Sequence, residues 1–165
     1  MEKQLSYAKS ELTKALLSLL ERKKLNEITI SELCSEASLS RLSFYRNYNS
    51  MEDIIREHLS GITDIFLTST EANFRTTPRE DFITLLFEHM YGMKDLVSLL
   101  INNNLPHLLK EGFDEAFMRS VNIYNDPYKC YVASGAYFNL FYYWFNNGCK
   151  EKPYEVSKML DGFLV

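Results

Sequence analysis

Glycine, proline and cysteine are all scarce in this 165-residue chain, which holds 6 glycines, 4 prolines and 3 cysteines. With so few helix-breaking residues, uninterrupted helices are expected over most of its length. The cysteines Cys34, Cys130 and Cys149 are odd in number and have no CxxC spacing. They therefore predict reduced thiols in a cytoplasmic protein, not a disulfide framework or a zinc site.

Long apolar runs are missing as well. The most apolar stretch, SGAYFNLFYYWF, is interrupted by Asn139 and falls well short of the roughly 20 residues that span a bilayer. The first residues, MEKQLSYAKSEL, contain no apolar segment of a secretory signal. We expect no membrane association.

The features of an enzyme site are absent from the sequence. It shows no nucleophile–base pair, no paired carboxylates in a motif and no glycine-rich phosphate loop. The three histidines, His58, His89 and His107, have no partners at metal-ligand spacing. We therefore predict a protein that is not an enzyme and that has neither a cofactor nor a metal.

Charge and aromatic residues divide the chain into two parts. Residues 1–58 carry nine basic and nine acidic side chains, whereas the remainder carries nine and thirteen, giving the net charge of -4. Nineteen of the 23 aromatic residues follow residue 58. A neutral small unit followed by an acidic, aromatic-rich one indicates two separate roles.

Apolar residues recur at helical spacing almost throughout, and no segment shows the alternation of a strand. The sequence predicts an all-α protein of about nine helices, over residues 5–22, 30–37, 41–48, 50–68, 79–91, 94–103, 105–122, 128–147 and 153–163.

Two of these helices are too short to be stable alone, and they are joined by the three-residue turn 38–40. Thr29 and Glu32 form a capping-box pattern at the start of the first, and Ser40 can cap the second. With Phe44 and Tyr48 turned inward, polar side chains are left on the outer surface of the second helix. This is the pattern of a helix-turn-helix, whose second helix lies in the DNA major groove.

The segment ITISELCSEASLSRLSFYRNYNSMEDII closely resembles the DNA-binding signature of the TetR family of bacterial transcriptional regulators. The matching features are the Thr-led short helix, Leu33, Ala37, Ser40 and the aromatic residues 44, 45 and 48. The segment YFNLFYYWFNNGCKEKPYEVSKML is similar to the last two helices of such regulators. The resemblance implies a three-helix DNA-binding domain over 1–50, a linking helix over about 50–68, and an effector-binding and dimerisation domain over 51–165.

Two positions depart from the family pattern. Ser38 stands where glycine is usual, so its backbone must adopt a conformation that glycine takes at no cost. Met51 replaces a lysine that usually faces phosphate, and each phosphate contact contributes about 0.9 to the salt slope of DNA binding. We expect weaker and less salt-dependent binding than a lysine would give.

The residues predicted to bind DNA lie on and beside the two short helices: Thr29, Ser31, Ser40, Arg41, Leu42, Ser43, Tyr45, Arg46, Asn47 and Met51. Tyr45 and Arg46 suit phosphate and base-edge contacts, against the simpler interpretation of an exposed surface pair. The stem of Arg41 could instead cover the helix flank. Leu42 has two equal interpretations, contact with a thymine methyl group or packing inward.

The aromatic residues of 137–145 cover every face of their helix, which predicts burial on all sides. Packing against the domain's own core and against a second subunit is favoured, because the resemblance implies a homodimer formed by the last two helices. The predicted interface residues are Phe138, Tyr142, Phe145, Tyr154, Met159 and Phe163. The more specific alternative is that these aromatic residues belong to a pocket for a small apolar or aromatic effector. Its predicted lining is Phe87, Met90, Tyr91, Leu100, Phe117, Tyr137 and Phe141.

The sequence thus supports a homodimeric regulator, in the first place a repressor, that binds double-stranded DNA at a palindromic operator and is released by a small molecule. The alternative is a module of the same fold that senses a ligand or acts through a protein partner, including activators. The near-neutral charge of residues 1–58 and Met51 favour this alternative.

Overall fold

The computed structural model describes residues 2–74, 79–119 and 126–160, with side chains described within 6–69, 81–119 and 126–159. These residues form α-helices and short 3-10 helices and contain no strand, which confirms the predicted all-α class. The elements are α1 (Glu2–Leu20), η1 (Leu25–Glu27), α2 (Ile30–Glu36), α3 (Arg41–Asn47), α4 (Met51–Phe74), α5 (Arg79–Gly92), α6 (Lys94–Asn102), α7 (Pro106–Arg119), α9 (Pro127–Asn146), α10 (Pro153–Ser157) and η2 (Lys158–Leu160).

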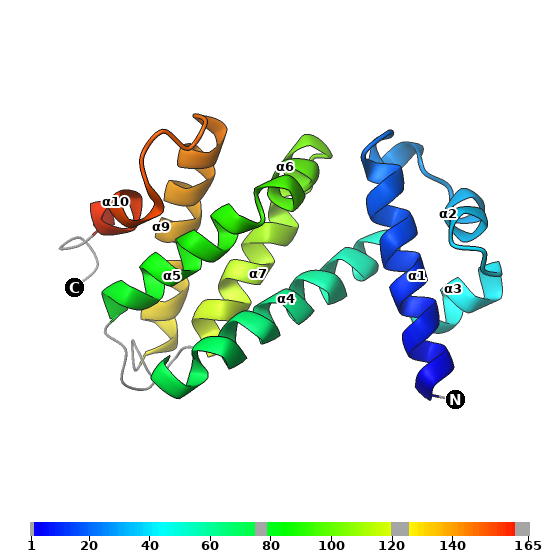
Figure 1. The fold of residues 1–165 in the computed structure, drawn as a ribbon, viewed down its shortest axis with the longest axis horizontal. Helices are drawn as coiled ribbons and strands as arrows, with labels where there is room; N and C mark the ends of the chain where they lie inside the picture. Colours follow the sequence, from blue (N-terminus) through cyan, green and yellow to red (C-terminus); the bar gives the residue numbers. More distant parts are fainter. Residues whose placement is uncertain (1, 75–78, 120–125, 161–165) are drawn as a thin grey trace.

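The helices α1, α2 and α3 lie together at one end of the molecule, and we call residues 2–50 the head (Figure 1). Its core is made by side chains at the apolar spacing of α1, which meet the inward faces of the two short helices. Leu12, Leu16, Leu33 and Phe44 are completely buried in it. This shared core stabilises α2 and α3, since helices of seven residues are too short to persist alone.

The long helix α4 runs from the head into the remaining helices, α5 to α10, which we call the body (Figure 1). α4 and α7 lie alongside each other and run in the same direction. Polar pairs at four-residue steps join them, each linking residues 55 positions apart: Arg56 with Glu111 at 2.8 Å, Ser60 with Glu115 at 3.0 Å, and Arg119 with Asp64 at 2.5 Å. The imidazole of His107 lies 3.7 Å from Glu52, one step nearer the head. We call these four pairs the polar ladder.

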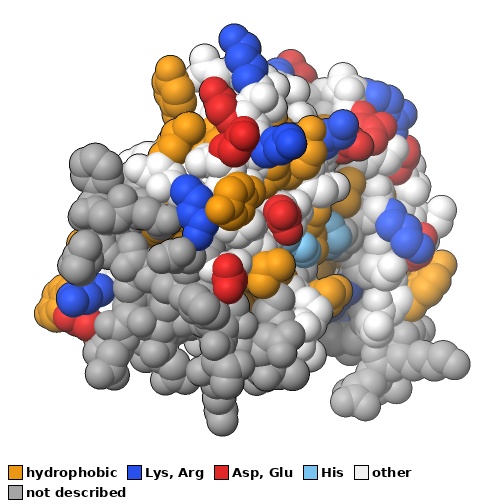
Figure 2. Space-filling model, turned by 60° about the vertical axis from the view of Figure 1, so that its left-hand side comes forward, with side chains coloured by type: hydrophobic (Ala, Val, Ile, Leu, Met, Phe, Trp, Pro, Cys, Tyr) orange, Lys and Arg blue, Asp and Glu red, His pale blue; other side chains and the backbone are white. Residues whose placement is uncertain are grey.

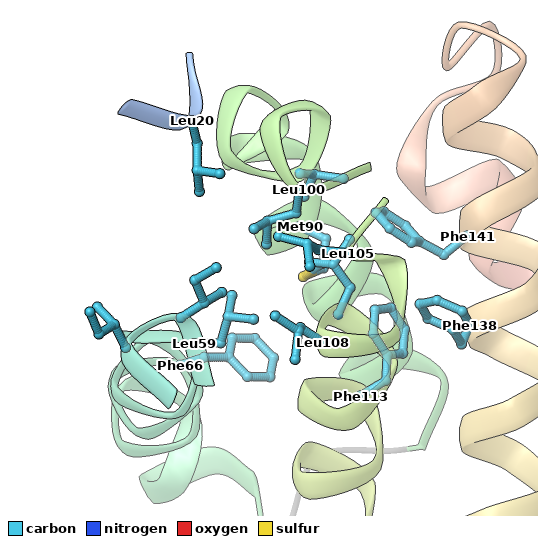
Figure 3. Packing of buried hydrophobic residues seen from close by; sticks show 14 of the residues in the cluster. Leu20, Leu59, Phe66, Met90, Leu100, Leu105, Leu108, Phe113, Phe138 and Phe141 are labelled. Atoms are coloured by element: carbon cyan, nitrogen blue, oxygen red, sulfur yellow. The ribbon is translucent and has the colours of Figure 1, made fainter. Parts of the chain in front are cut away.

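Aromatic rings pack among aliphatic side chains in the core of the body (Figure 3). Phe113 of α7 meets Phe138 and Phe141 of α9, with ring centroids 5.4 Å apart in both pairs. Phe87 of α5 packs edge-on against Phe141 at 5.9 Å. These buried rings hold α5, α7 and α9 together as a bundle.

A second contact joins head and body beside α4. The amide of Asn103, at the end of α6, donates to the carbonyl of Leu20 at the end of α1 over 3.1 Å. The ammonium of Lys24 donates to the carbonyl of Asn102. The side chain of Leu20 is buried in the same apolar cluster as Leu100 and Leu105 (Figure 3).

The helix predictions agree with these elements to within a few residues, with three differences. α4 continues to Phe74, beyond the predicted end near residue 68. The 3-10 turn Leu25–Glu27 was not predicted. After Pro153 the α-helix ends at Ser157 and gives way to η2, and the predicted continuation to residue 163 lies partly outside the described residues.

Candidate nucleic-acid interface

Both short helices begin with a side-chain cap, as the sequence predicts. Thr29 accepts a hydrogen bond from the backbone N–H of Glu32 at 3.1 Å, and Ser40 accepts one from Ser43 at 3.1 Å. Each cap satisfies one of the N–H groups that a helix start leaves free. Thr29 and Ser40 are exposed, so their hydroxyl groups remain accessible from the solvent side.

The turn between α2 and α3 is a Schellman motif. The N–H of Leu39 bonds to the carbonyl of Cys34 at 2.8 Å, and the N–H of Ser38 bonds to Ser35 at 3.1 Å. Ser38 has φ +53°, the left-handed conformation that glycine adopts at no cost. The expectation that Ser38 takes a glycine-like conformation is confirmed.

Two aromatic side chains fix α3 against the head. Phe44 is completely buried and Tyr48 is 5% exposed. The ring of Tyr45 stands edge-on against Phe44, with centroids 5.2 Å apart and an interplanar angle of 81°. Tyr45 is nevertheless 52% exposed, so its phenol points outward from a ring whose orientation is held by the core.

The outer surface of α3 carries the exposed residues Arg41, Leu42, Tyr45 and Arg46. Leu42 is 59% exposed, which excludes the interpretation that it packs inward. Ser31 of α2 is exposed as well. The structure therefore places seven of the predicted DNA-binding residues, these five and the caps Thr29 and Ser40, at the surface of the helix-turn-helix.

Asn47 and Ser43 of α3 are half-buried, unlike the exposed residues of the same helix. The amide N–H of Asn47 donates to the carbonyl of Ser43 at 2.6 Å, and its Oδ1 atom is buried. The hydroxyl of Ser43 lies 3.0 Å from that of Ser40. Both side chains were predicted to face DNA, but their polar atoms are directed at the protein itself.

The charges of the head separate into paired and unpaired ones. Most described cations between residues 6 and 60 bind a carboxylate: Lys9 to Glu57, Lys14 to Glu11, Arg22 to Glu36, Lys23 to Glu32, and Arg56 to Glu52, Asp53 and Glu111. Lys24 binds a carbonyl of the body. Arg41 and Arg46 of α3 form neither an ion pair nor a hydrogen bond with the described residues. The free positive charge of the described head therefore lies on α3.

The start of α4 follows directly after α3. Asp53 accepts hydrogen bonds from the N–H groups of Ser50 at 2.8 Å and Asn49 at 3.1 Å, and the hydroxyl of Ser50 accepts from Asp53 at 3.2 Å. Burial alone would raise the pKa of Asp53, but these hydrogen bonds and Arg56 outweigh it and lower the pKa. Met51 packs its half-buried side chain against the core.

Cys34 of α2 lies beneath this surface and is 3% exposed. Burial raises the pKa of its thiol, against a smaller opposite effect of Arg41. A protonated, enclosed thiol is a poor nucleophile. Cys34 is therefore a small core residue, and a redox role has no support here.

A small apolar cavity lies within the body, between α4, α5 and α7. Its volume is about 30 Å³, and its lining includes Leu59, Phe66, His89, Met90 and Phe113. The Nε2 atom of His89 is buried there without a described partner, its ring is stacked on Phe66 at 4.8 Å, and burial lowers its pKa.

The predicted ligand-binding residues mostly lie elsewhere. Among them, Met90 lines this cavity, and Tyr91 is 40% exposed and stacks near Trp144. The others are buried in the core of the body: Phe87, Leu100, Phe117, Tyr137 and Phe141. The apolar residues of α4 that line the cavity were not predicted, because their spacing alone does not distinguish a cavity wall from packed core.

The helix α9 is buried on one side and open on the other. Along its open side, residues recur at steps of four and three, which is the spacing of a helix–helix seam. We call this the outer stripe: Tyr128, Val132, Gly135, Asn139, Tyr142 and Asn146. Tyr128 and Val132 are 83% and 63% exposed, and the flanking Tyr131 and Tyr143 are 55% and 70% exposed.

The predicted dimer residues take several positions. Tyr154 and Met159 are exposed, and Tyr142 and Phe145 are half-buried. Phe138, predicted at the interface, is 9% exposed and packs on Phe113 of its own chain. Phe163 lies outside the described residues. The 4–3 spacing from Tyr128 could have been found in the sequence, where the dense aromatic cluster obscured it.

Elsewhere the surface carries mixed charge. Figure 2 shows a face of the body on which acidic, basic and hydrophobic side chains are interspersed. Among the described residues, no group of histidine, cysteine and acidic side chains could hold a metal ion. None of the described helices is long and apolar enough to cross a membrane.

No family model matches the chain, and no curated protein matches it. Among solved structures, it is similar to the crystal structure of the TetR family repressor AlkX from Dietzia sp. strain DQ12-45-1b, which is implicated in biodegradation of n-alkanes. The similarity covers 94% of each chain, with a TM-score of 0.56 and 15% sequence identity. The chain therefore has the fold of a TetR family repressor.

Proposed function

We propose that the chain is a TetR-like homodimeric regulator, which binds a palindromic operator in the cytoplasm and represses transcription. The observation that carries the proposal is the charge pattern of the head and of the first turns of α4. Paired acidic groups neutralise the side chains of Lys9, Lys14, Arg22, Lys23 and Arg56, whereas Arg41 and Arg46 stay free beside the outward Tyr45. Two guanidinium groups and a phenol on one rigid helix suit contacts to phosphates and base edges.

The outer stripe supports the homodimer. Tyr128, Val132 and Tyr142 are large apolar or aromatic side chains at seam spacing, and a symmetric pair of such helices would bury them. A Cβ at Gly135, in the middle of the stripe, would meet no side chain or other helix of the described residues within 4 Å. That position leaves room for a partner helix to approach closely. A two-fold dimer would place two copies of α3 on half-sites related by the same symmetry.

The proposal includes release by a small apolar or aromatic effector at the cavity of α4, α5 and α7. Its apolar lining and the unpartnered Nε2 of His89 suit a ligand with one hydrogen-bonding group. At about 30 Å³ the cavity is far smaller than the roughly 150 Å³ that accommodates benzene in an engineered protein core. Binding therefore requires α4 and α7 to separate, which would lengthen or break the hydrogen bonds and ion pairs of the polar ladder between them.

Selection of binding sites from a random duplex library at physiological salt tests the proposal. The wild type is expected to enrich a palindrome, and Tyr45→Ala to lose it while remaining folded. Tyr91→Ala is the matched control, since it removes a 40% exposed tyrosine from α5, away from the head. Enrichment that is unchanged in Tyr45→Ala would contradict the assignment of α3 as the recognition helix.

The second candidate is a module that keeps this fold and acts through a protein partner. It is favoured by the zero net charge of residues 1–58 and by Met51 at the start of α4. Binding to random duplex DNA separates the two. Affinity that rises as salt is lowered supports the regulator, and complete absence of binding at low salt supports the module.

A further inference from the structure

Leu42 is the unusual residue of the recognition helix. It is a leucine that is 59% exposed on a helix of seven residues, whereas Leu33 of α2 is completely buried. Its side chain therefore contributes little to the core of the head. It shares one helix surface with Tyr45 and Arg46, which follow it by three and four residues and are both exposed.

A hydrogen bond within the protein removes Asn47 from the residues of α3 that could recognise a base. Bidentate recognition of adenine requires a free side-chain amide. The amide of Asn47 is held by the Ser43 carbonyl at 2.6 Å, and its Oδ1 is buried. The outward surface of α3 thus offers two guanidinium groups, a phenol and one apolar tip. The arginines suit phosphate or guanine. The apolar tip of Leu42 suits neither of these and requires an apolar group in the groove.

The major groove of DNA presents one apolar group among the four ordinary bases, the C5-methyl group of thymine. We propose that Leu42 recognises this methyl group in each half-site and thereby sets a preference for thymine over cytosine at one symmetric position. The proposal rests on the proposed function, since it concerns the surface with which the regulator would read its operator. It also assigns Asn47 a structural role in place of base reading.

The test replaces the methyl group in the DNA. In the selected operator, each symmetric pair of thymines is exchanged for deoxyuridine, which lacks only that methyl group. Affinities of the wild type and Leu42→Ala are then measured by fluorescence anisotropy at one salt concentration. We expect the wild type to lose about fourfold per half-site at one position, the effect of leaving one methyl group unburied.

Leu42→Ala is expected to bind thymine and deoxyuridine equally at that position. Its thermal midpoint should match that of the wild type, because an exposed side chain is removed and alanine favours the helix. Leu42→Met, which restores a long apolar side chain, should recover part of the discrimination. This variant separates the loss of an apolar contact from a general disturbance of α3.

The outcomes separate the two proposals. An enriched operator in which no thymine is sensitive to deoxyuridine overturns the role of Leu42 and leaves the regulator intact. The same holds if Leu42→Ala discriminates as well as the wild type does. Failure to enrich any sequence overturns the proposed function, and the role of Leu42 with it. Sensitivity at one position that disappears in Leu42→Ala and returns in Leu42→Met supports both.

Discussion

Three residues of different type end helices in the same way. Ser38, Asn104 and Gly148 each have positive φ, of +53°, +61° and +83°, and each is followed by a hydrogen bond that closes a Schellman motif. Glycine takes this conformation freely, asparagine with modest cost, and serine with more. The glycine-like conformation of Ser38 and the end of α9 at Gly148 are predictable from the sequence, because turn chemistry is local.

Replacing Ser38 by glycine should stabilise the head. Relief of the left-handed strain, about 1–2 kcal/mol, is partly offset by the greater freedom of glycine in the unfolded chain. We expect the free energy of unfolding in urea to rise by about 0.5–1 kcal/mol.

Gly148→Ser is the reciprocal control. Apart from the chain neighbours, a Cβ there would meet no atom of the described residues within 4 Å, so the change introduces backbone strain and should lower the free energy of unfolding by about 1 kcal/mol. A destabilised Ser38→Gly variant would show that the hydroxyl of Ser38 contributes more than its backbone conformation costs.

Other properties of single residues could not be predicted. The sequence places Asn47 on the outer side of α3, but its amide turns back to Ser43. That choice depends on the space left around the helix by neighbouring elements. The exposure of Leu42 was undecided for the same reason, since an amphipathic pattern in a seven-residue helix leaves the flank positions ambiguous.

Among the elements, α4 is joined to the segment that follows α3 by hydrogen bonds in its first turn. Ser50 and Asp53 cap each other reciprocally, so the chain leaving α3 and the start of α4 form one hydrogen-bonded unit. The spacing of Ser50 and Asp53, three residues apart in the sequence, is that of a helix cap. The end of α4 at Phe74 was not visible, because polar residues there resemble a loop.

The stability of this cap should depend on pH. The pKa of Asp53 is lowered in the folded chain from an ordinary value of 3.8, so its contribution is present above about pH 4 and lost as the pH falls through the folded pKa. We expect the free energy of unfolding of Asp53→Asn to fall less steeply than that of the wild type below pH 4.

Ser50→Ala provides the comparison, since it removes the hydroxyl half of the cap without a titrating group. It should lower stability by about 1 kcal/mol at neutral pH. Parallel pH curves for Asp53→Asn and the wild type, measured by thermal unfolding between pH 3 and 7, would show that the carboxylate of Asp53 makes no net contribution.

For the whole molecule, charge and aromatic content predict two units that divide after residue 58, and a domain boundary at residue 50 remains a prediction from the family resemblance. The arrangement within the body could not be predicted. The 55-residue offset of the polar ladder requires α4 and α7 to pack side by side in parallel, which no local pattern in either helix encodes. The cavity between α4, α5 and α7 arises from the same packing, so its lining could not be predicted residue by residue.

Dimerisation through the outer stripe can be tested with a single substitution that introduces a charge. Val132→Glu places a carboxylate on the most exposed part of the outer stripe, and we expect it to shift the protein from dimer to monomer in sedimentation velocity at micromolar concentration. Ile65→Glu is the matched control, because Ile65 is similarly exposed, at 69%, but lies on α4. A Val132→Glu protein that stays dimeric would move the interface away from α9.

The hydrogen bond between Asn103 and Leu20 gives the head a second attachment besides α4. If α4 were the only connection, the head could rotate in any direction relative to the rest of the chain. With two attachments it can rotate only about the line that joins them. In the proposed dimer, each copy of α3 would then move along a single arc. An operator spacer that is one base pair longer turns the second half-site by about 34°, along a direction set by the duplex and not by that arc. In the proposed regulator, the contact at Leu20 would therefore restrict which half-site spacings the two copies of α3 can reach.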